Sequence, residues 1–323
     1  MNITPETNRQ HVSRDNLKTY LRMIDTIFGI DTILSGADDK TAVAKYYKES
    51  HPAYRLLHSS KGAVHMALSD DGTFSKEDYI RQSEFVGHII RKRSCRSVLE
   101  LGSGNGYNSI YLAHRYPDVR FTGIDLTPVH VRDSRRRSKT LNNVQFFEDD
   151  FENPNLTSNS YDLIFAVESL CHSFDLETVL AQAARMLKKG GMIVIFDELS
   201  KINPEVLDHD MRTAAELVIT SMAVGKERTK DVFMKALYDA DFENVTIEDL
   251  SENIMPNLLR LQYYSLHFFK RPVRAKIITA LLPYHMVQNA VAGLLMPFTV
   301  EQKIHGYFRI TAEKKGNLSY SSD

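Results

Sequence analysis

Cysteine, an excess of charge of one sign and long apolar runs are all scarce in this sequence of 323 residues. The two cysteines, Cys95 and Cys171, are too few and too far apart in the sequence to predict a disulfide framework or a metal site. Forty basic and forty-one acidic side chains leave a net charge of −1, which excludes a globally basic nucleic-acid-binding protein. No stretch approaches the roughly 18 apolar residues of a membrane span, and the N-terminus has no apolar signal core. We therefore expect a soluble, cytoplasmic protein without a metal ion or a nucleic-acid partner.

Apolar residues are nonetheless 43% of the chain, enough for a large buried core. Helical spacing dominates residues 13 to 60, where a second helix is expected to end before His51-Pro52. The sequence predicts four segments: a helical cap over 1–84, a core domain over 85–254, a helical lid over 255–303, and a last core strand with its tail over 304–323.

The segment from about residue 85 alternates short β-rich runs with helical patterns. Strands are predicted at 96–101, 120–126, 143–148, 161–167, 192–198, 243–250 and 305–315. A helix over 175–191 is expected to stop at Gly190-Gly191. This alternation predicts an α/β fold, a doubly wound and mostly parallel sheet with helices on both faces.

The run VLELGSGNGYNS carries the most information about function. A strand ends at Glu100-Leu101, and residues 102–106, with their three glycines, lead into a helix. Tyr107 stands where a dinucleotide-binding loop would have its third glycine, and Glu100 would repel a pyrophosphate. Asp125 ends the second strand, where a carboxylate can accept hydrogen bonds from ribose hydroxyls. A ligand with a ribose and a positive centre fits best, namely S-adenosylmethionine; the alternative is a tight turn that binds nothing.

Residues 96–198, together with 229–250 and 305–315, resemble a class I S-adenosylmethionine-dependent methyltransferase. The resemblance implies seven strands and a cofactor site. The glycine loop and Glu100 would hold the methionine part, Asp125 the ribose, Leu126 the adenine ring, and Asp150 with Phe151 the adenine edge. The implied cofactor-binding residues are Tyr47, Glu100, Gly102, Ser103, Gly104, Gly106, Asp125, Leu126, Asp150, Phe151 and Val167.

The stretch AVESLCHSFD (166–175) is similar to sterol side-chain methyltransferases, which are related to the tocopherol and cyclopropane-type enzymes. Those enzymes have a tyrosine-bearing helix and a histidine-bearing loop before the first strand. The resemblance assigns Tyr46 or Tyr47 to the helix and His65 to the loop. It implies Glu168, His172 and His65 as catalytic residues.

Each catalytic candidate also has a structural interpretation. Glu168 could bond loop amides at the end of a strand, and His172 could pack at the start of a helix. His65 lies between apolar residues, where a buried structural histidine is nearly as plausible as a catalytic one. Cys171 is interpreted as a packing residue, because methyl transfer requires no covalent intermediate.

Two basic clusters need an interpretation. The first, 132–139, is taken as a solvated helix face, since it lacks the interleaved aromatic residues of an RNA-binding surface. The second, 256–300, has five Lys or Arg, no Asp or Glu, and many apolar residues. It is either a helical lid on the core, a homodimer face, or a lid over an apolar substrate that also touches a membrane surface. We favour the last.

The sequence therefore predicts methyl transfer from S-adenosylmethionine to a small, largely apolar acceptor, an isoprenoid, a sterol-like molecule or another lipid, at carbon. One alternative is an oxygen- or nitrogen-methyltransferase of a polar natural product or a phospholipid head group. The other is a non-catalytic protein that binds S-adenosylmethionine for regulation.

Overall fold

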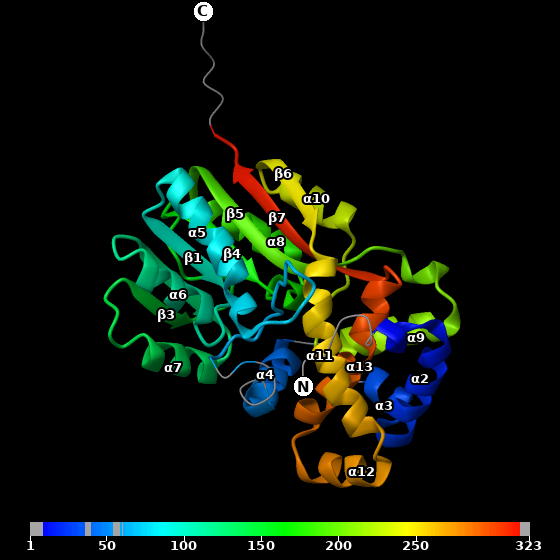
Figure 1. Cartoon of the computed structure of the whole chain (residues 1–323). Helices are drawn as coiled ribbons and strands as arrows, with labels where there is room; N and C mark the ends of the chain where they lie inside the picture. The colour runs from blue at the N-terminus through cyan, green and yellow to red at the C-terminus, as the bar shows by residue number, and fades with distance from the viewer. Residues whose placement is uncertain (1–8, 36–39, 54–58, 60, 317–323) are drawn as a thin grey trace, which may run out of the picture. The chain divides into compact units, whose positions relative to one another are not determined.

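The computed structural model describes residues 9–35, 40–53, 59 and 61–316 (Figure 1). These residues form two compact units. The helical unit comprises Met1–Arg81, Glu198–Thr229 and Asp249–Tyr307, and the sheet unit comprises Gln82–Asp197, Lys230–Glu248 and Phe308–Asp323. The division into a cap, a core, a lid and a last strand stays a prediction.

Seven strands form one sheet in the order β3-β2-β1-β4-β5-β7-β6. The ladders that join β3, β2, β1, β4 and β5 are parallel. The predicted α/β fold class is confirmed. The strands are β1 (Ser97–Leu101), β2 (Arg120–Asp125), β3 (Val144–Glu148), β4 (Tyr161–Val167), β5 (Leu187–Ser200), β6 (Phe242–Asp249) and β7 (His305–Lys314).

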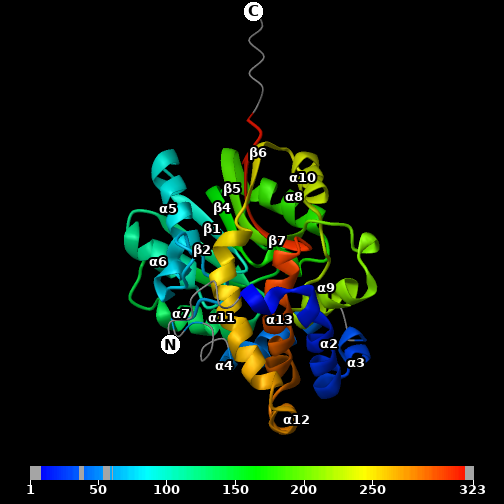
Figure 2. The same cartoon turned by 45° about the vertical axis from the view of Figure 1, so that its right-hand side comes forward.

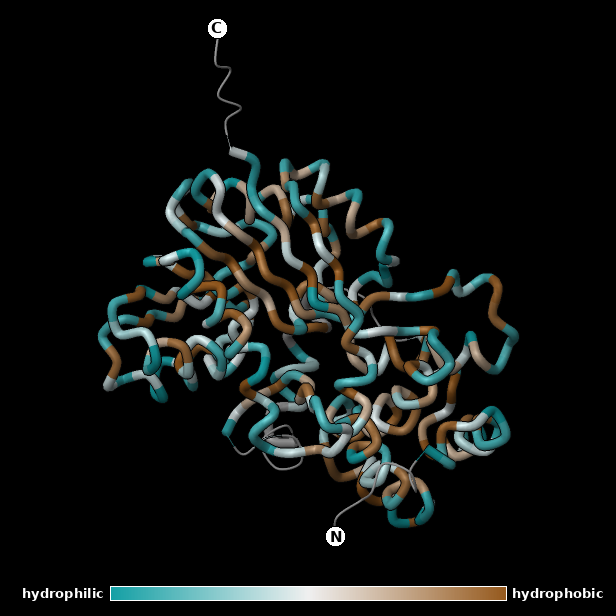
Figure 3. The backbone as a smooth tube through the Cα atoms, turned by 45° about the horizontal axis from the view of Figure 1, so that its top comes forward, coloured by the Kyte–Doolittle hydropathy of each residue, from teal (hydrophilic) through white to brown (hydrophobic). Residues whose placement is uncertain are grey.

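Helices cover both faces of the sheet. On one side lie α5 (Arg81–Arg93), α6 (Tyr107–Arg115) and α7 (Pro128–Arg137), and on the other α8 (Leu176–Met186) and α10 (Lys230–Asp239) (Figure 2). Every residue of β1 is buried, and hydrophobic colouring follows the central strands (Figure 3). Strands covered on both faces need such continuous apolar runs, which is why they were readable from the sequence.

The predicted boundary between the helix over 175–191 and the strand over 192–198 is wrong. The helix α8 ends at Met186, and β5 begins at Leu187 rather than at 192. Tyr161 pairs with Leu187 but Leu163 pairs with Met192, so the residues between them form a bulge in β5. Gly190 has a φ of +69°, which a glycine adopts at little cost. The glycine therefore turns a strand instead of ending a helix.

The helical unit is built from η1 (Arg9–Val12), α2 (Arg14–Phe28), α3 (Ile30–Leu34), α4 (Lys40–Ala53), η3 (Lys76–Ile80), η5 (Pro204–Val206), α9 (His209–Ser221), α11 (Ser251–Phe269), α12 (Pro272–Leu281) and α13 (Tyr284–Glu301). The helix α4 continues through Pro52, so its predicted end before His51 is wrong. All side chains from 291 to 300 in α13 are buried, and this helix packs against α4, α9 and α11. None of the helices among the described residues is long and apolar enough to cross a bilayer.

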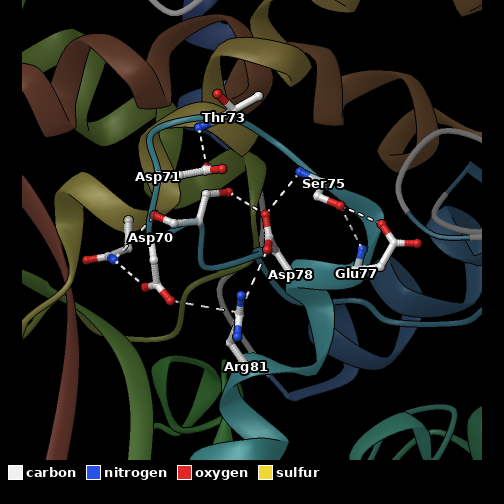
Figure 4. Close-up of polar contacts among 9 residues, drawn as sticks. Asp70, Asp71, Thr73, Ser75, Glu77, Asp78 and Arg81 are labelled. Atoms are coloured by element: carbon white, nitrogen blue, oxygen red, sulfur yellow. Dashed lines mark hydrogen bonds and ion pairs between the residues drawn. The ribbon is translucent and has the colours of Figure 1, made fainter.

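A polar network fixes the loop before α5 (Figure 4). The buried carboxylate of Asp78 accepts hydrogen bonds from the Ser69 hydroxyl at 2.8 Å and the Ser75 amide at 3.0 Å. Ser75 in turn caps η3 in a reciprocal capping box, and the Arg81 guanidinium lies 3.8 Å from Asp78. These contacts give the segment after His65 a defined course without regular secondary structure.

Candidate functional site

The glycine loop follows β1 and leads into α6. Gly102, Gly104 and Gly106 have φ angles of 69°, 50° and 74°, in the left-handed region that residues with a Cβ avoid. The Ser103 amide donates to the Ile124 carbonyl at 2.9 Å, which ties the loop to the end of β2. The loop is thus a rigid backbone surface at the carboxyl ends of the strands.

The loop packs closely against the end of β4. A Cβ on Gly102 would lie 2.3 Å from the Cβ of Ser169, so only glycine fits at this position. The Ser169 hydroxyl donates to the Leu101 carbonyl at 2.7 Å. Because the strand order reverses between β1 and β4, this contact marks the topological switch point, where α/β sheets bind their ligands.

Glu100 is buried at the end of β1, 2% exposed. Its carboxylate accepts hydrogen bonds from the Asn108 amide group at 3.1 Å and from the Ser109 amide at 3.2 Å and hydroxyl at 2.5 Å. Burial raises the pKa of Glu100 to about 7, because these neutral donors only partly offset the lost hydration. The Glu100 carboxylate therefore links α6 to β1. Its hydrogen-bond donors are all neutral, so it can still pair with a cation.

Asp125 ends β2 and is also buried. It accepts hydrogen bonds from the amides of Gly104 and Thr127, both at 2.8 Å, and the His130 imidazole lies 3.4 Å away. Burial alone would raise the pKa of Asp125, but the hydrogen bond and charge of His130, together with the two amides, lower it. The Oδ2 atom accepts only the Gly104 amide and keeps a further lone pair, so the group can still accept a hydroxyl donor.

Three candidates lie beyond Asp125. Leu126 is 39% exposed, an unusual position for a leucine beside a buried acid. Asp150 and Phe151 follow β3 and are half-buried, and the Asp150 carboxylate accepts a hydrogen bond from the Glu152 amide at 2.9 Å. Their side chains offer an apolar surface and a carboxylate on the same side of the switch point as Asp125.

Glu168 directly follows β4 and the buried Val167. It is half-buried, and its φ of 50° is one of the few positive values at residues other than glycine. Its amide donates to the Phe196 carbonyl of β5 at 2.8 Å. Such backbone strain costs about 1–3 kcal/mol and concentrates at functional sites. This strained residue directly precedes Ser169, which packs against Gly102 of the glycine loop.

His172 ends the short η4 helix (Leu170–His172) and is half-buried. Within that helix, the Cys171 amide donates to the Asp197 carboxylate at 3.0 Å, which fixes the turn that carries the histidine. Cys171 is half-buried and is not part of a disulfide. Within the described ranges, no group of three or more His, Cys, Asp or Glu is placed to hold a metal ion.

Two further candidates belong to the helical unit. His65 is 2% exposed, its Nδ1 lies 3.0 Å from the Met66 carbonyl, and its ring meets that of Tyr79 edge-on. Tyr46 is buried and donates to Asn289 at 2.5 Å, while Tyr47 is half-buried. Tyr46 thus has a packing role, and Tyr47 is the one of the two with exposed surface.

Sequence reasoning missed several polar residues. Ser169 carries no recognisable motif, because it acts on Leu101 and Gly102, which are distant in the sequence. His130 was missed although it lies only five residues from Asp125, because the spacing alone does not show the contact. The same holds for His305, whose Nε2 lies 3.4 Å from Glu227 in the helical unit. Burial alone would lower the pKa of His305, but hydrogen bonding to Glu227 and the charges of Glu198 and Glu227 raise it.

A family model described as a methyltransferase domain matches residues 98–191. A curated relative, an S-adenosyl-L-methionine-dependent Diels-Alderase of Talaromyces variabilis, is 30% identical over 238 residues, which are 69% of this chain and 80% of the relative. The chain belongs to the class I S-adenosylmethionine-dependent methyltransferases. A sterol 24-C-methyltransferase of Eremothecium gossypii is 23% identical to this methyltransferase; the match covers 68% of the present chain and 62% of the relative.

Solved structures agree on the fold of the methyltransferase. A mycolic acid cyclopropane synthase in complex with SAH and CTAB superimposes with a TM-score of 0.71 at 13% identity, over 86% of this chain and 99% of that one. The predicted family, fold class and cofactor, S-adenosylmethionine, are confirmed.

The residues at the carboxyl ends of the strands fit this cofactor. The left-handed glycine loop allows close backbone approach, and Asp125 keeps acceptor capacity for a ribose hydroxyl at Oδ2. The exposed Leu126 is where an adenine ring would cover an apolar side chain. Glu100 would gain a cationic partner from the methionine ammonium group.

Proposed function

We propose that this methyltransferase methylates a small, largely apolar acceptor, an isoprenoid, a sterol-like molecule or another lipid, at a carbon atom. The observation that carries the proposal is the strained Glu168, half-buried beside the glycine loop at the switch point. A sterol enzyme that methylates carbon is among the relatives. The match supports the acceptor class without defining the molecule.

The bound cofactor supplies an electrophilic methyl group on a sulfonium. The chain's own residues align the acceptor and exclude water, and Glu168 stabilises positive charge that develops on the acceptor. When the acceptor is an alkene, a proton must leave after the methyl arrives. Glu168 takes that proton, directly or through His172, which follows it on the same turn. The half-buried Tyr47 and the buried His65 remain candidate residues in the helical unit.

Glu168→Gln tests this role, because it keeps the shape and removes the charge. Turnover should fall roughly 10²–10³-fold, the size expected when one preorganised electrostatic contact is lost. Cofactor affinity should change much less, since Glu100, the glycine loop and Asp125 are untouched. Labelled cofactor and lipid extracts, analysed by mass spectrometry, would supply the acceptor and the methylated atom.

The matched control is Glu152→Gln. Glu152 is also half-buried, and its carboxylate accepts a hydrogen bond from the Phe174 amide at 2.8 Å. The same chemical change there should leave turnover near normal. Near-normal turnover of Glu168→Gln would make that residue structural and leave His65 as the next candidate base.

A second candidate function is a cyclisation in which the cofactor stays bound and unreacted. The observation that favours it is the Diels-Alderase at 30% identity. Methyl transfer converts S-adenosylmethionine to S-adenosylhomocysteine, whereas a cyclisation leaves the cofactor unreacted. A product with an unchanged acceptor mass, formed without release of S-adenosylhomocysteine, would replace the carbon-methylation proposal.

A second proposal concerns the residues that cover the acceptor. Residues 256–300 form α12 and most of α11 and α13, and we propose that they act as a lid over an apolar substrate. A heteroatom acceptor, predicted for a polar natural product or head group, would be recognised by the carbon chemical shift of a methyl group transferred from labelled cofactor, because a methyl bonded to oxygen or nitrogen resonates downfield of one bonded to carbon.

A further inference from the structure

The helix α12, at the turn between α11 and α13 (Figure 2), exposes an apolar stripe. Val273, Ile277 and Leu281 are 75%, 55% and 77% exposed, far more than large aliphatic side chains usually are. Their spacing of four residues places them on one face of the helix. Ala275 is fully buried on the opposite face. The stripe is therefore an outward face with no partner among the described residues.

Cations flank this stripe. At the helical repeat, Arg274 projects on one side of the apolar face and Lys276 on the other; both are exposed, as are Lys270 and Arg271 just before the helix. The whole block from 256 to 300 contains no Asp or Glu. No acid within α12 pairs with these cations, so their charge is available to a partner.

An apolar face bordered by cations is the pattern of a helix that lies in the interface of an anionic bilayer. Aliphatic side chains enter the acyl boundary, and the flanking Lys and Arg meet the head-group phosphates. A second copy of the same helix would bring like charges together, because the face carries no acid. A nucleic acid would leave the aliphatic stripe uncovered.

We propose that α12 docks this protein onto an anionic lipid surface, with Val273, Ile277 and Leu281 inserted and Arg274 and Lys276 on the head groups. The proposal concerns a surface outside the cofactor site and does not depend on the acceptor. Docking would place the protein at the bilayer surface, and apolar molecules partition into the bilayer.

Vesicle flotation of the full chain tests the proposal, using phosphatidylcholine vesicles with and without phosphatidylserine. The protein should float with the anionic vesicles, and added salt should weaken the binding, since the attraction is screened within a Debye length of about 8–10 Å. Absence of binding to anionic vesicles at low salt would overturn the proposal.

Two variants separate the contribution of the cations to vesicle binding from that of the apolar stripe. Arg274→Glu/Lys276→Glu should weaken binding at least about 25-fold, at roughly fivefold for each cation lost near an anionic surface. Ile277→Asp/Leu281→Asp should weaken it about tenfold or more, because the apolar contribution is lost. Both should keep the wild-type circular dichroism and affinity for S-adenosylhomocysteine.

Matched controls carry the same changes elsewhere. Val206→Asp/Val232→Asp alters two exposed aliphatic residues outside α12, and Arg132→Glu/Lys139→Glu removes charge from the other basic cluster. Both should bind vesicles like the wild type. Equal loss in the control variants, or a dimer in light scattering that Ile277→Asp/Leu281→Asp dissociates, would reject lipid docking.

Discussion

Glu100 and Asp162 lie at opposite edges of the sheet, and their pKa values shift in opposite directions. At the carboxyl edge, Glu100 is buried among neutral donors, and its pKa rises to about 7. At the amino edge, Asp162 accepts from the Arg96 and Ser97 amides and from Lys188 at 2.7 Å. Burial alone would raise the pKa of Asp162, but the Lys188 hydrogen bond and those amides lower it.

This difference in partners suggests different roles: Asp162 stabilises the fold, whereas Glu100 belongs to a binding site. A carboxylate that already has a cationic partner adds to the free energy of unfolding, whereas one that lacks it is destabilised until a cation arrives. Two glycines with the same φ also differ in their surroundings. Gly102 is enclosed by Ser169, whereas Gly190 faces open space. The predictions below test each half of this comparison.

The largest effect is expected for Gly102→Ala, with Gly190→Ala as its matched control. Both glycines have a φ of 69°, so both variants take on the left-handed penalty of about 1–2 kcal/mol. Only Gly102→Ala also displaces Ser169, which should bring its total loss of unfolding free energy to about 2–5 kcal/mol. Urea unfolding measures both. Equal losses would mean that the loop relaxes away from Ser169.

Next come Glu100→Gln and Asp162→Asn, which should have opposite pH dependences. The raised pKa means that the stabilising contribution of Glu100 is present below its usual pKa of 4.5 and is lost as the pH rises through about 7. Wild-type stability should therefore fall by ~3 kcal/mol relative to Glu100→Gln across this window.

The lowered pKa of Asp162 reverses the sign. Its contribution is present above the usual pKa of 3.8 and is lost as the pH falls through its folded value. Urea unfolding of both variants from acid to neutral pH checks the pair. Parallel curves for the two variants would contradict the contrast between the edges.

The smallest effect is on cofactor affinity. Asp125→Ala should weaken binding of S-adenosylmethionine and its demethylated product by about 1.5–3 kcal/mol, because hydrogen bonds to a charged acceptor are lost. Asp162→Ala removes a comparable carboxylate at the other edge and should leave the affinity unchanged. Isothermal calorimetry measures both; equal weakening would reveal a global effect on the fold.

The sequence predicted most of the sheet because its strands are buried on both faces, and buried strands have continuous apolar runs. It predicted Glu100 and Asp125 because their chemistry follows from their places at strand ends. The start of β5 could not be predicted, since Lys188, its second residue, pairs with Asp162 of β4, which is distant in the sequence. The proline at 52 also misled, because the residue before a proline only disfavours the helical conformation, and α4 continues to Ala53.

The left-handed backbone of Glu168 and the contact of Ser169 with Gly102 were beyond prediction for another reason. The letters Glu-Ser after a strand carry no backbone signature, and the fit of Ser169 against Gly102 depends on two segments far apart in the chain. The sequence identified Glu168 by resemblance, but only the structure supplies a physical reason, strain, for placing function there.

The helical unit draws on Met1–Arg81, Glu198–Thr229 and Asp249–Tyr307, interrupted by the segments of the sheet unit. A growing chain emerges from the ribosome at about 5–20 residues per second. The first segment must therefore wait roughly ten to forty-five seconds for the last one, with the apolar faces of α2 and α4 still uncovered. Meanwhile β1 to β4 can pair among themselves. Newly made chains should depend on chaperones during synthesis, and slow translation near residue 307 should lower the yield of folded protein.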